Sequence, residues 1–183
     1  VLPGTYTVKL IVGNKDYTSK LLLVHDNSNK LFSEEDAKTQ FDAAMELYHM
    51  HEQLKVLVDK INAEQLLLTN NMDSVRKPQS KKLLKAYHDK LEELRSTLLA
   101  TKHKSIFADE KKLREYITED YGAICGQECR PTNLQVGRIS VLNDDLKKGE
   151  DSYQKLVAEY SEKTEKTIST DRVRKIMEPR NSN

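Results

Sequence analysis

The sequence predicts a mainly α-helical fold, an elongated up-down bundle of three arms with an N-terminal β-hairpin. The first observation is a stripe within residues 131–168, whose members recur at alternating spacings of three and four residues. Such spacing is typical of one helix face that packs against other helices. The stripe consists of Ile139, Leu142, Leu146, Gly149, Tyr153, Leu156 and Tyr160. The second observation is that residues 1–26 hold two β-rich segments separated by a turn sequence.

The composition agrees with a thin helical bundle and argues against some partners. Of the 183 residues, 37% are hydrophobic and 32% are charged, as expected where much of every helix faces water. The 30 Lys and Arg residues nearly balance the 29 Asp and Glu residues, so no field of one sign would attract nucleic acid. No apolar run approaches the roughly 18 residues of a membrane span. Because the chain begins at Val1 and not at Met, we expect a processed product or part of a longer protein.

Residues 1–26 are expected to form the hairpin, with strands over residues 5–12 and 17–24. Apolar and polar residues alternate in the first strand, which places Tyr6, Val8 and Leu10 on one face. An isolated hairpin is marginally stable in water. We therefore expect it to pack on the helices, to pair with another chain, or to complete a sheet whose other strands precede it, and we favour the last alternative.

Residues 31–178 are expected to form the bundle, with residues 179–183 as a tail. The first helix should begin after Ser33, which can cap it, and run to about residue 69. A loop over residues 70–80 and a second helix over residues 81–102 follow. The helical spacing of apolar residues is interrupted near Phe107, and a third helix is expected after it that ends at about residue 122.

The final long helix starts at residues 131–133, and Thr170-Asp171 is expected to cap a separate short turn after it. The first and last helices have similar expected lengths, about 36 and 37 residues, and the second and third together match them. Three arms of similar length therefore fit side by side if the second and third helices run in series. The alternative is a four-helix bundle with short middle helices.

Two cysteines, Cys125 and Cys129, are the main candidate for covalent chemistry. They are expected to form a local disulfide or to remain two free thiols. A metal site would need further ligands, and a nucleophilic cysteine would need a base such as His88 or His103, which nothing in the sequence places nearby.

Two short motifs resemble metal sites but lack required ligands. Glu46 and His49 match one Glu-x-x-His element of a di-iron bundle, which needs a second such element that the sequence lacks. His51 and Glu52 begin like a zinc-protease helix, but Lys55 stands where the second histidine should be. We therefore expect no metal and no cofactor.

The basic residues and the helical tyrosines are explained by surface solvation and by packing, without a catalytic role. The basic cluster is expected to be a solvated surface, with contact to an anion or acidic partner as the alternative. It consists of Arg76, Lys77, Lys81, Lys82 and Lys85. The helical tyrosines are expected in or near the core, with hydroxyls that reach water. They are Tyr48, Tyr87, Tyr116, Tyr121, Tyr153 and Tyr160.

The N-terminal hairpin resembles the final hairpin of a small immunoglobulin-like β-sandwich, through the stretch at residues 3–12, Lys15-Asp16-Tyr17-Thr18 and the strand at residues 21–24. In bacterial sortilin-like β-propeller proteins, often labelled BNR-repeat glycosyl hydrolases, such a hairpin precedes a helical tail. The helix entry at residues 33–48, with Gln40-Phe41 and Leu47-Tyr48, is similar to the start of that tail.

The later part of the chain resembles the same tail at Tyr121-Gly122, at Pro131-Thr132 and along the last helix. The resemblance implies export from a bacterial cell, to the periplasm, the cell surface or the medium. It also implies a C-terminal position in a larger protein whose propeller lies upstream. No catalytic residue can be carried over. The loop from Cys125 to Cys129 and the high Lys and Glu content depart from the family pattern.

These observations lead us to expect a non-enzymatic C-terminal module that docks on its parent protein or on a partner. One alternative is an accessory wall of a glycan or peptide hydrolase site located upstream. Another is a self-association module that pairs through hairpin edges or helix seams.

Overall fold

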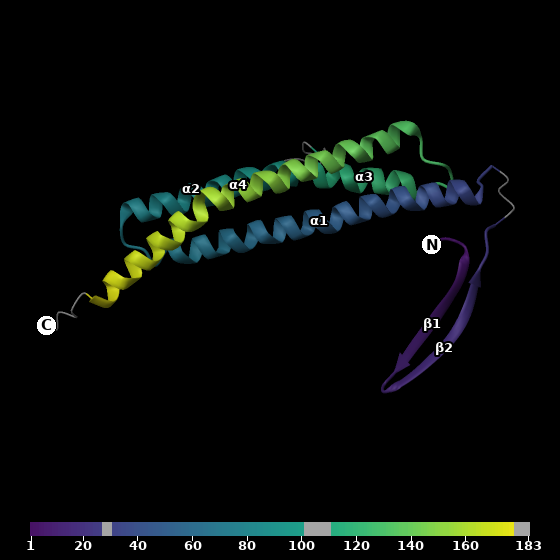
Figure 1. Ribbon diagram of the computed structural model, residues 1–183, viewed down its shortest axis with the longest axis horizontal. Helices are drawn as coiled ribbons and strands as arrows, with labels where there is room; N and C mark the ends of the chain where they lie inside the picture. The colour runs from purple at the N-terminus through teal and green to yellow at the C-terminus, as the bar shows by residue number, and fades with distance from the viewer. Residues whose placement is uncertain (27–30, 101–110, 178–183) are drawn as a thin grey trace, which may run out of the picture.

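The computed structural model of the protein describes residues 1–26, 31–100 and 111–177, with side chains placed as far as residue 170. In chain order the elements are β1 (Gly4–Val12), β2 (Lys15–Leu23), α1 (Glu34–Met72), α2 (Pro78–Leu98), α3 (Leu113–Cys125) and α4 (Asn133–Met177). The prediction of a helical bundle with an N-terminal β-hairpin is therefore confirmed (Figure 1).

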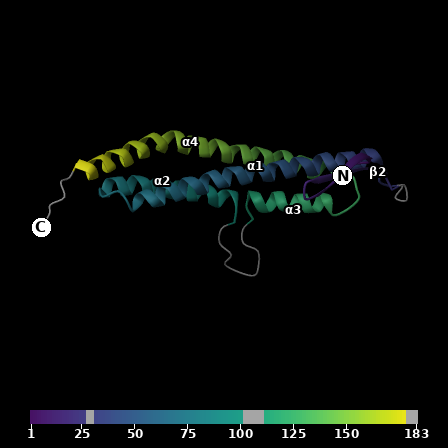
Figure 2. The same cartoon turned by 90° about the horizontal axis from the view of Figure 1, so that it is seen from below.

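The bundle has three arms, and α2 and α3 share the middle one. Figure 2 shows these two helices in series, and α4 packs directly on α2 as well as on α1 and α3. α1 packs against α2, α3 and α4. The predicted up-down-up arrangement is therefore confirmed, and its middle arm consists of two separate shorter helices. The expected break at Phe107 lies outside the described residues.

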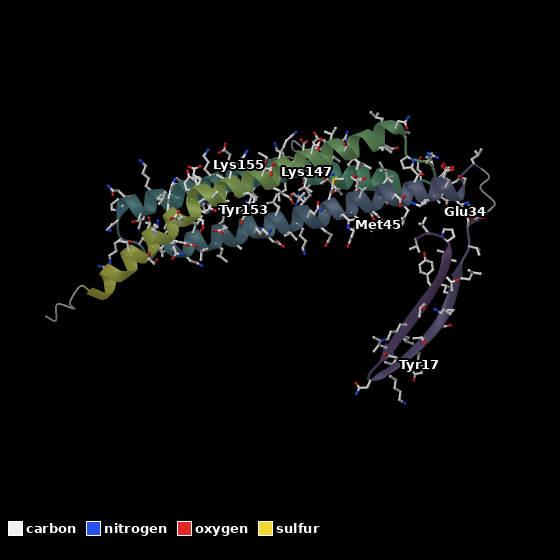
Figure 3. All side chains as sticks on the ribbon, in the orientation of Figure 1. Tyr17, Glu34, Met45, Lys147, Tyr153 and Lys155 are labelled. Carbon is white, nitrogen blue, oxygen red and sulfur yellow. The ribbon has the colours of Figure 1, made fainter. Side chains whose placement is uncertain are left out.

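The stripe on α4 forms the seam of the core, as predicted. Ile139, Leu142, Leu146 and Tyr153 are at most 8% exposed, and Figure 3 shows Tyr153 between α4 and α1. The facing residues of the other helices are equally buried and include Leu47, Ile61, Leu84, Leu91 and Ile117. Each such side chain contributes about 1.5–3 kcal/mol when fully buried, so this core holds the arms together along their length.

Local hydrogen bonds explain where the helices begin and end. The Asp36 N–H donates to Ser33 Oγ at 3.1 Å, and the Ser33 N–H donates to Asp36 Oδ2 at 3.2 Å, which confirms the predicted cap at the start of α1. The Glu115 carboxylate accepts hydrogen bonds from the backbone N–H groups of Ala100 and Lys112. One side chain thereby links the residues after α2 to those before α3.

Several predicted boundaries were wrong. α1 continues through Asn71, whose side chain donates to the Leu67 carbonyl at 2.7 Å and so does not interrupt the helix. α2 begins at Pro78, because proline fits the first turn of a helix. The expected cap at Thr170-Asp171 does not form: Thr170 Oγ1 donates to the Lys166 carbonyl at 2.7 Å, and α4 runs unbroken to Met177.

Candidate functional site

The hairpin is closed by a two-residue turn that fixes its register. β1 pairs with β2 from Gly4 opposite Leu23 to Val12 opposite Lys15. Gly13 at the turn has φ +60°, a conformation that glycine adopts without strain, and Asn14 has negative φ. This combination matches a type II′ turn, whose twist suits the flanking strands.

The register sorts the side chains of the hairpin into an apolar and a mainly polar face. Side chains of residues paired across the two strands lie on the same face of a sheet. The apolar face consists of Tyr6, Val8, Leu10, Val12, Tyr17, Leu21 and Leu23, together with two polar residues, Lys15 and Ser19. On the opposite face Lys20 Nζ donates to Thr7 Oγ1 at 2.6 Å, and Lys9 forms an ion pair of 2.7 Å with Asp16. That face also carries Ile11 and Leu22.

The apolar face is open to solvent. Its apolar side chains are exposed by between 36% (Leu23) and 60% (Leu10). Among the described elements neither strand packs on a helix, and the hairpin projects away from the bundle, with Tyr17 near its tip (Figure 3). Contiguous apolar surface of this kind on a protein typically marks an interaction site.

The base of the hairpin is attached to the start of α1. Phe32 directly precedes the helix cap and is only 7% exposed. Its carbonyl lies 2.9 Å from His25 Nε2, and the two rings are 6.0 Å apart. The Tyr6 hydroxyl donates to the Leu2 carbonyl. These contacts place the hairpin at the end of the bundle where α1 begins.

A cavity of about 500 Å³ lies at this junction. The hairpin contributes Leu23 to its lining, α1 contributes Phe41 and Met45, and α3 contributes Tyr121 and Cys125. Nearby, Gln40 Nε2 donates to the Ile124 carbonyl at 2.6 Å and holds the end of α3 against α1. The apolar face of the hairpin therefore continues through Leu23 into a partly apolar recess of the bundle.

A second hollow, of about 520 Å³, lies between α3 and α4. Leu134 and Val141 of α4 line it and are 83% and 58% exposed. Arg138 lies 5.1 Å from the centre of the Tyr116 ring, and its Nε is 2.6 Å from Asp120 Oδ2. The cation–π contact and the ion pair orient Arg138 along this groove.

The candidate chemical residues remain apart or exposed. Cys125 and Cys129 are free, exposed thiols at the end of α3 and in the loop after it. Glu46 and His49 are exposed on α1, and His51 Nε2 lies 3.2 Å from Thr118 Oγ1 of α3. His88 lies on α2, whereas His103 falls outside the described residues. Within the described ranges no His, Cys, Asp and Glu side chains cluster as metal ligands.

The basic cluster agrees with the predicted solvated surface, whereas the tyrosines follow their prediction only in part. The cluster lies at the start of α2, at the opposite end of the bundle from the hairpin, and Lys85 is paired with Asp89 at 2.8 Å. Tyr87 is 1% exposed and stacks on Tyr160, with ring centres 5.0 Å apart. Tyr153 is 8% exposed, so the predicted core position is confirmed for Tyr87 and Tyr153, but the Tyr87 hydroxyl is buried and does not reach water as predicted. Tyr48, Tyr116 and Tyr121 are 37–45% exposed, so the prediction of a core or boundary position was wrong for these three.

Sequence reasoning identified the apolar side of the first strand but missed the contribution of the second. Tyr17 and Leu21 join that face only through the register, which the two-residue turn at Gly13-Asn14 could have indicated. The junction cavity depends on how the hairpin meets the bundle, for which the sequence carries no local signal.

Comparison of the chain with protein-family models, with curated proteins and with solved structures finds no match. None of the helices in the described residues is long and apolar enough to cross a membrane.

Proposed function

We propose that this protein is a non-catalytic interaction module whose hairpin docks on another β-sheet while the helical bundle serves as a rigid arm. The single observation that carries the proposal is the exposed apolar face of the hairpin. A strand pair with one mainly apolar face is typical of a β-sandwich, where that face packs on a second sheet. An unpartnered two-stranded sheet lacks that second layer.

The proposed source of the second sheet is an immunoglobulin-like domain upstream in the same exported protein. The resemblance to sortilin-like propeller proteins motivates this assignment, and the hairpin geometry supports it because a sandwich supplies a sheet of the required kind. Half-exposed apolar side chains such as Leu10 and Tyr17 would each gain on the order of 1 kcal/mol on burial. Summed over the face, that gain is comparable to the stability of a small domain.

The test compares two variants that add the same charge to opposite faces of the hairpin. Leu10→Lys lies on the apolar face, and Thr18→Lys, its matched control, lies on the polar face. We expect Leu10→Lys to lower the melting temperature of the natural-length protein by several degrees and to leave that of residues 1–183 unchanged. Thr18→Lys should change neither. Equal effects of the two variants on the natural-length protein would contradict docking through the apolar face.

A further inference from the structure

The start of α2 carries backbone donors that no side chain satisfies. The helix begins at Pro78, and the side chain of Lys77 before it makes no capping hydrogen bond. The first turn contains no acidic residue. The N–H groups of Gln79 and Ser80, at the second and third helical positions, therefore have no acceptor in the part of the chain that the structure describes. The positive end of the helix dipole lies at the same place and favours an anion.

The side chain of Ser80 is buried and has no hydrogen-bond partner among the described residues. Ser80 is 6% exposed and belongs to the buried stripe of α2 that continues with Leu84 and Tyr87. The Tyr87 ring stacks on Tyr160, so this stripe faces α4. Buried hydroxyl groups are normally hydrogen-bonded, because a buried donor without an acceptor costs free energy. The Ser80 hydroxyl therefore lies where a ligand could supply the missing acceptor.

Ser80 lines a surface cavity of about 370 Å³ between α2 and α4. Lys77 and Gln79 line it from the start of α2, and Lys166 and Thr167 line it from α4. Among the lining residues that the structure describes, two are lysines and none is Asp or Glu. The volume lies within the usual range for small-molecule sites. The cavity is therefore lined by hydrogen-bond donors and positive charge, with no opposing carboxylate on the described lining.

Lys166 brings its positive charge to the cavity from α4. Its Nζ pairs with Glu162, one turn earlier on the same helix, at 2.5 Å, and the two side chains are 75% and 77% exposed. An exposed ion pair of this kind contributes little to stability, so an anion in the cavity can compete for the ammonium group. Thr167 follows Lys166 directly and is half-buried, which places a further hydroxyl at the cavity wall.

We propose that this cavity, the α2 anion site, binds the phosphate group of a soluble phosphate monoester. The site consists of Lys77, Gln79, Ser80, Lys166 and Thr167. A phosphate group has three acceptor oxygens and carries a charge near −2, so it can accept bonds from two backbone N–H groups, a hydroxyl and an ammonium group together. A carboxylate has only two oxygens and would leave some of these donors unpaired. The site lies at the opposite end of the bundle from the hairpin (Figure 1) and is separate from the proposed docking face.

Titration of the protein with glycerol phosphate, followed by the amide signals in nuclear magnetic resonance spectra, tests the site. We expect the signals of Gln79 and Ser80 to shift most, with a Kd of about 1 mM or tighter. Sodium acetate at the same ionic strength should bind at least about 10-fold more weakly, because it leaves donors unpaired. Equal binding of acetate would overturn the assignment to phosphate. Shifts spread evenly over the exposed lysines of α2, without Gln79 and Ser80, would overturn the site.

Two variants test the donors within the site. Ser80→Ala removes the buried hydroxyl and should weaken the binding of glycerol phosphate by about 10-fold. Gln79→Glu places a carboxylate at the positive end of the helix dipole, so it should abolish binding without lowering the melting temperature. Gln53→Glu, the same substitution at an exposed position of α1, is the matched control and should leave the Kd unchanged. Equal losses of affinity in the two glutamate variants would overturn the site, because net charge alone would then govern binding.

A phospholipid headgroup offers the same phosphate chemistry, and vesicles distinguish the two sources. We expect the protein to sediment no more with vesicles of equal parts phosphatidylcholine and phosphatidic acid than with pure phosphatidylcholine vesicles. The physical reason is that the Ser80 hydroxyl is recessed between α2 and α4, where a headgroup fixed in a bilayer does not reach. Binding to the phosphatidic acid vesicles without binding to glycerol phosphate would overturn the assignment to a soluble ligand.

Discussion

A Cβ atom added to Gly149 of α4 would lie 2.8 Å from Cδ2 of Leu98 on α2. Leu98 is 2% exposed and has little room to move. The two helices therefore pass each other here without space for a further side chain. We expect Gly149→Val to destabilise the protein by about 1–3 kcal/mol, because it overpacks the core. Urea unfolding followed by circular dichroism measures this change.

Gly137 on the same helix is the matched control. No atom lies within 4 Å of a Cβ added there, so Gly137→Ala should stabilise the protein by about 0.5–1 kcal/mol through helix propensity alone. Gly149→Ala should fall short of that gain by about 1 kcal/mol or more, since its methyl group meets Leu98. Equal gains at the two positions would show that the close approach to Leu98 is absent in solution.

The hydroxyl of Tyr87 is buried and has no hydrogen-bond partner among the described residues. Burial raises the pKa of this hydroxyl well above its ordinary value. We expect Tyr87→Phe to be neutral or to stabilise the protein by up to about 1 kcal/mol, because it removes an unpaired polar group and keeps the ring stack with Tyr160. Tyr87→Ala should cost about 3–5 kcal/mol. A clear loss of stability in Tyr87→Phe would reveal a buried water bound to the hydroxyl.

Glu115 makes the stability depend on pH. Burial alone would raise the pKa of its carboxyl group, but hydrogen bonds from Arg114 and from the Ala100 N–H outweigh burial and hold the pKa below its usual range. A lowered carboxyl pKa stabilises the fold above the pKa of the unfolded chain, and this stabilisation is lost as the pH falls through the folded pKa. Glu115→Gln should therefore cost stability at neutral pH, by about 1 kcal/mol or less, because solvent still screens this partly buried carboxylate.

The difference between the wild type and Glu115→Gln should shrink as the pH falls through the lowered pKa of the folded Glu115, because the protonated carboxyl group is neutral like the glutamine. Chemical unfolding at neutral and at acid pH measures this change. Glu52→Gln, at an exposed position of α1, is the control and should show the same small effect at both pH values. A penalty for Glu115→Gln that persists in acid would mean that shape, and not charge, links α2 to α3.

The disulfide expected between Cys125 and Cys129 remains a prediction, and the exposed thiols make it testable. A hydrogen bond with Cys125 raises the pKa of the Tyr121 hydroxyl. We expect both thiols of the reduced protein to react with a thiol reagent without unfolding. Oxidation to a disulfide should return the pKa of Tyr121 toward its ordinary value, as followed by ultraviolet titration. The short loop limits the added stability to about 2 kcal/mol. An unchanged Tyr121 titration after oxidation would contradict that hydrogen bond.

The architecture of the bundle could be predicted because it depends on local periodicity and length. The spacing of apolar residues within α4 predicts the seam from Ile139 to Tyr153. The position of Ser33 directly before the acidic first turn of α1 predicts the cap. Helix boundaries were harder, because Asn71 and Thr170 make side-chain bonds within their own helices instead of ending them. Both residues are capable of either role, and only the completed backbone decides which one they adopt.

The candidate site was only partly predictable. Alternation in β1 located Tyr6, Val8 and Leu10 on one face, since side-chain direction in a strand has a fixed period of two. The contribution of Tyr17 required the pairing register. The junction cavity required the packing of Phe32 and the approach of α3 to Gln40, which are contacts between distant parts of the chain.

The length of α1 has an electrostatic consequence. Its 39 residues separate the hairpin from the basic cluster at the start of α2 by roughly 58 Å of helix. At 0.1 M salt a charge is screened over about 10 Å. Counterions therefore keep the two ends of the arm from sensing each other, and a charged molecule held at one end leaves the potential at the other unchanged. The bundle acts as an insulating spacer between two independent surfaces.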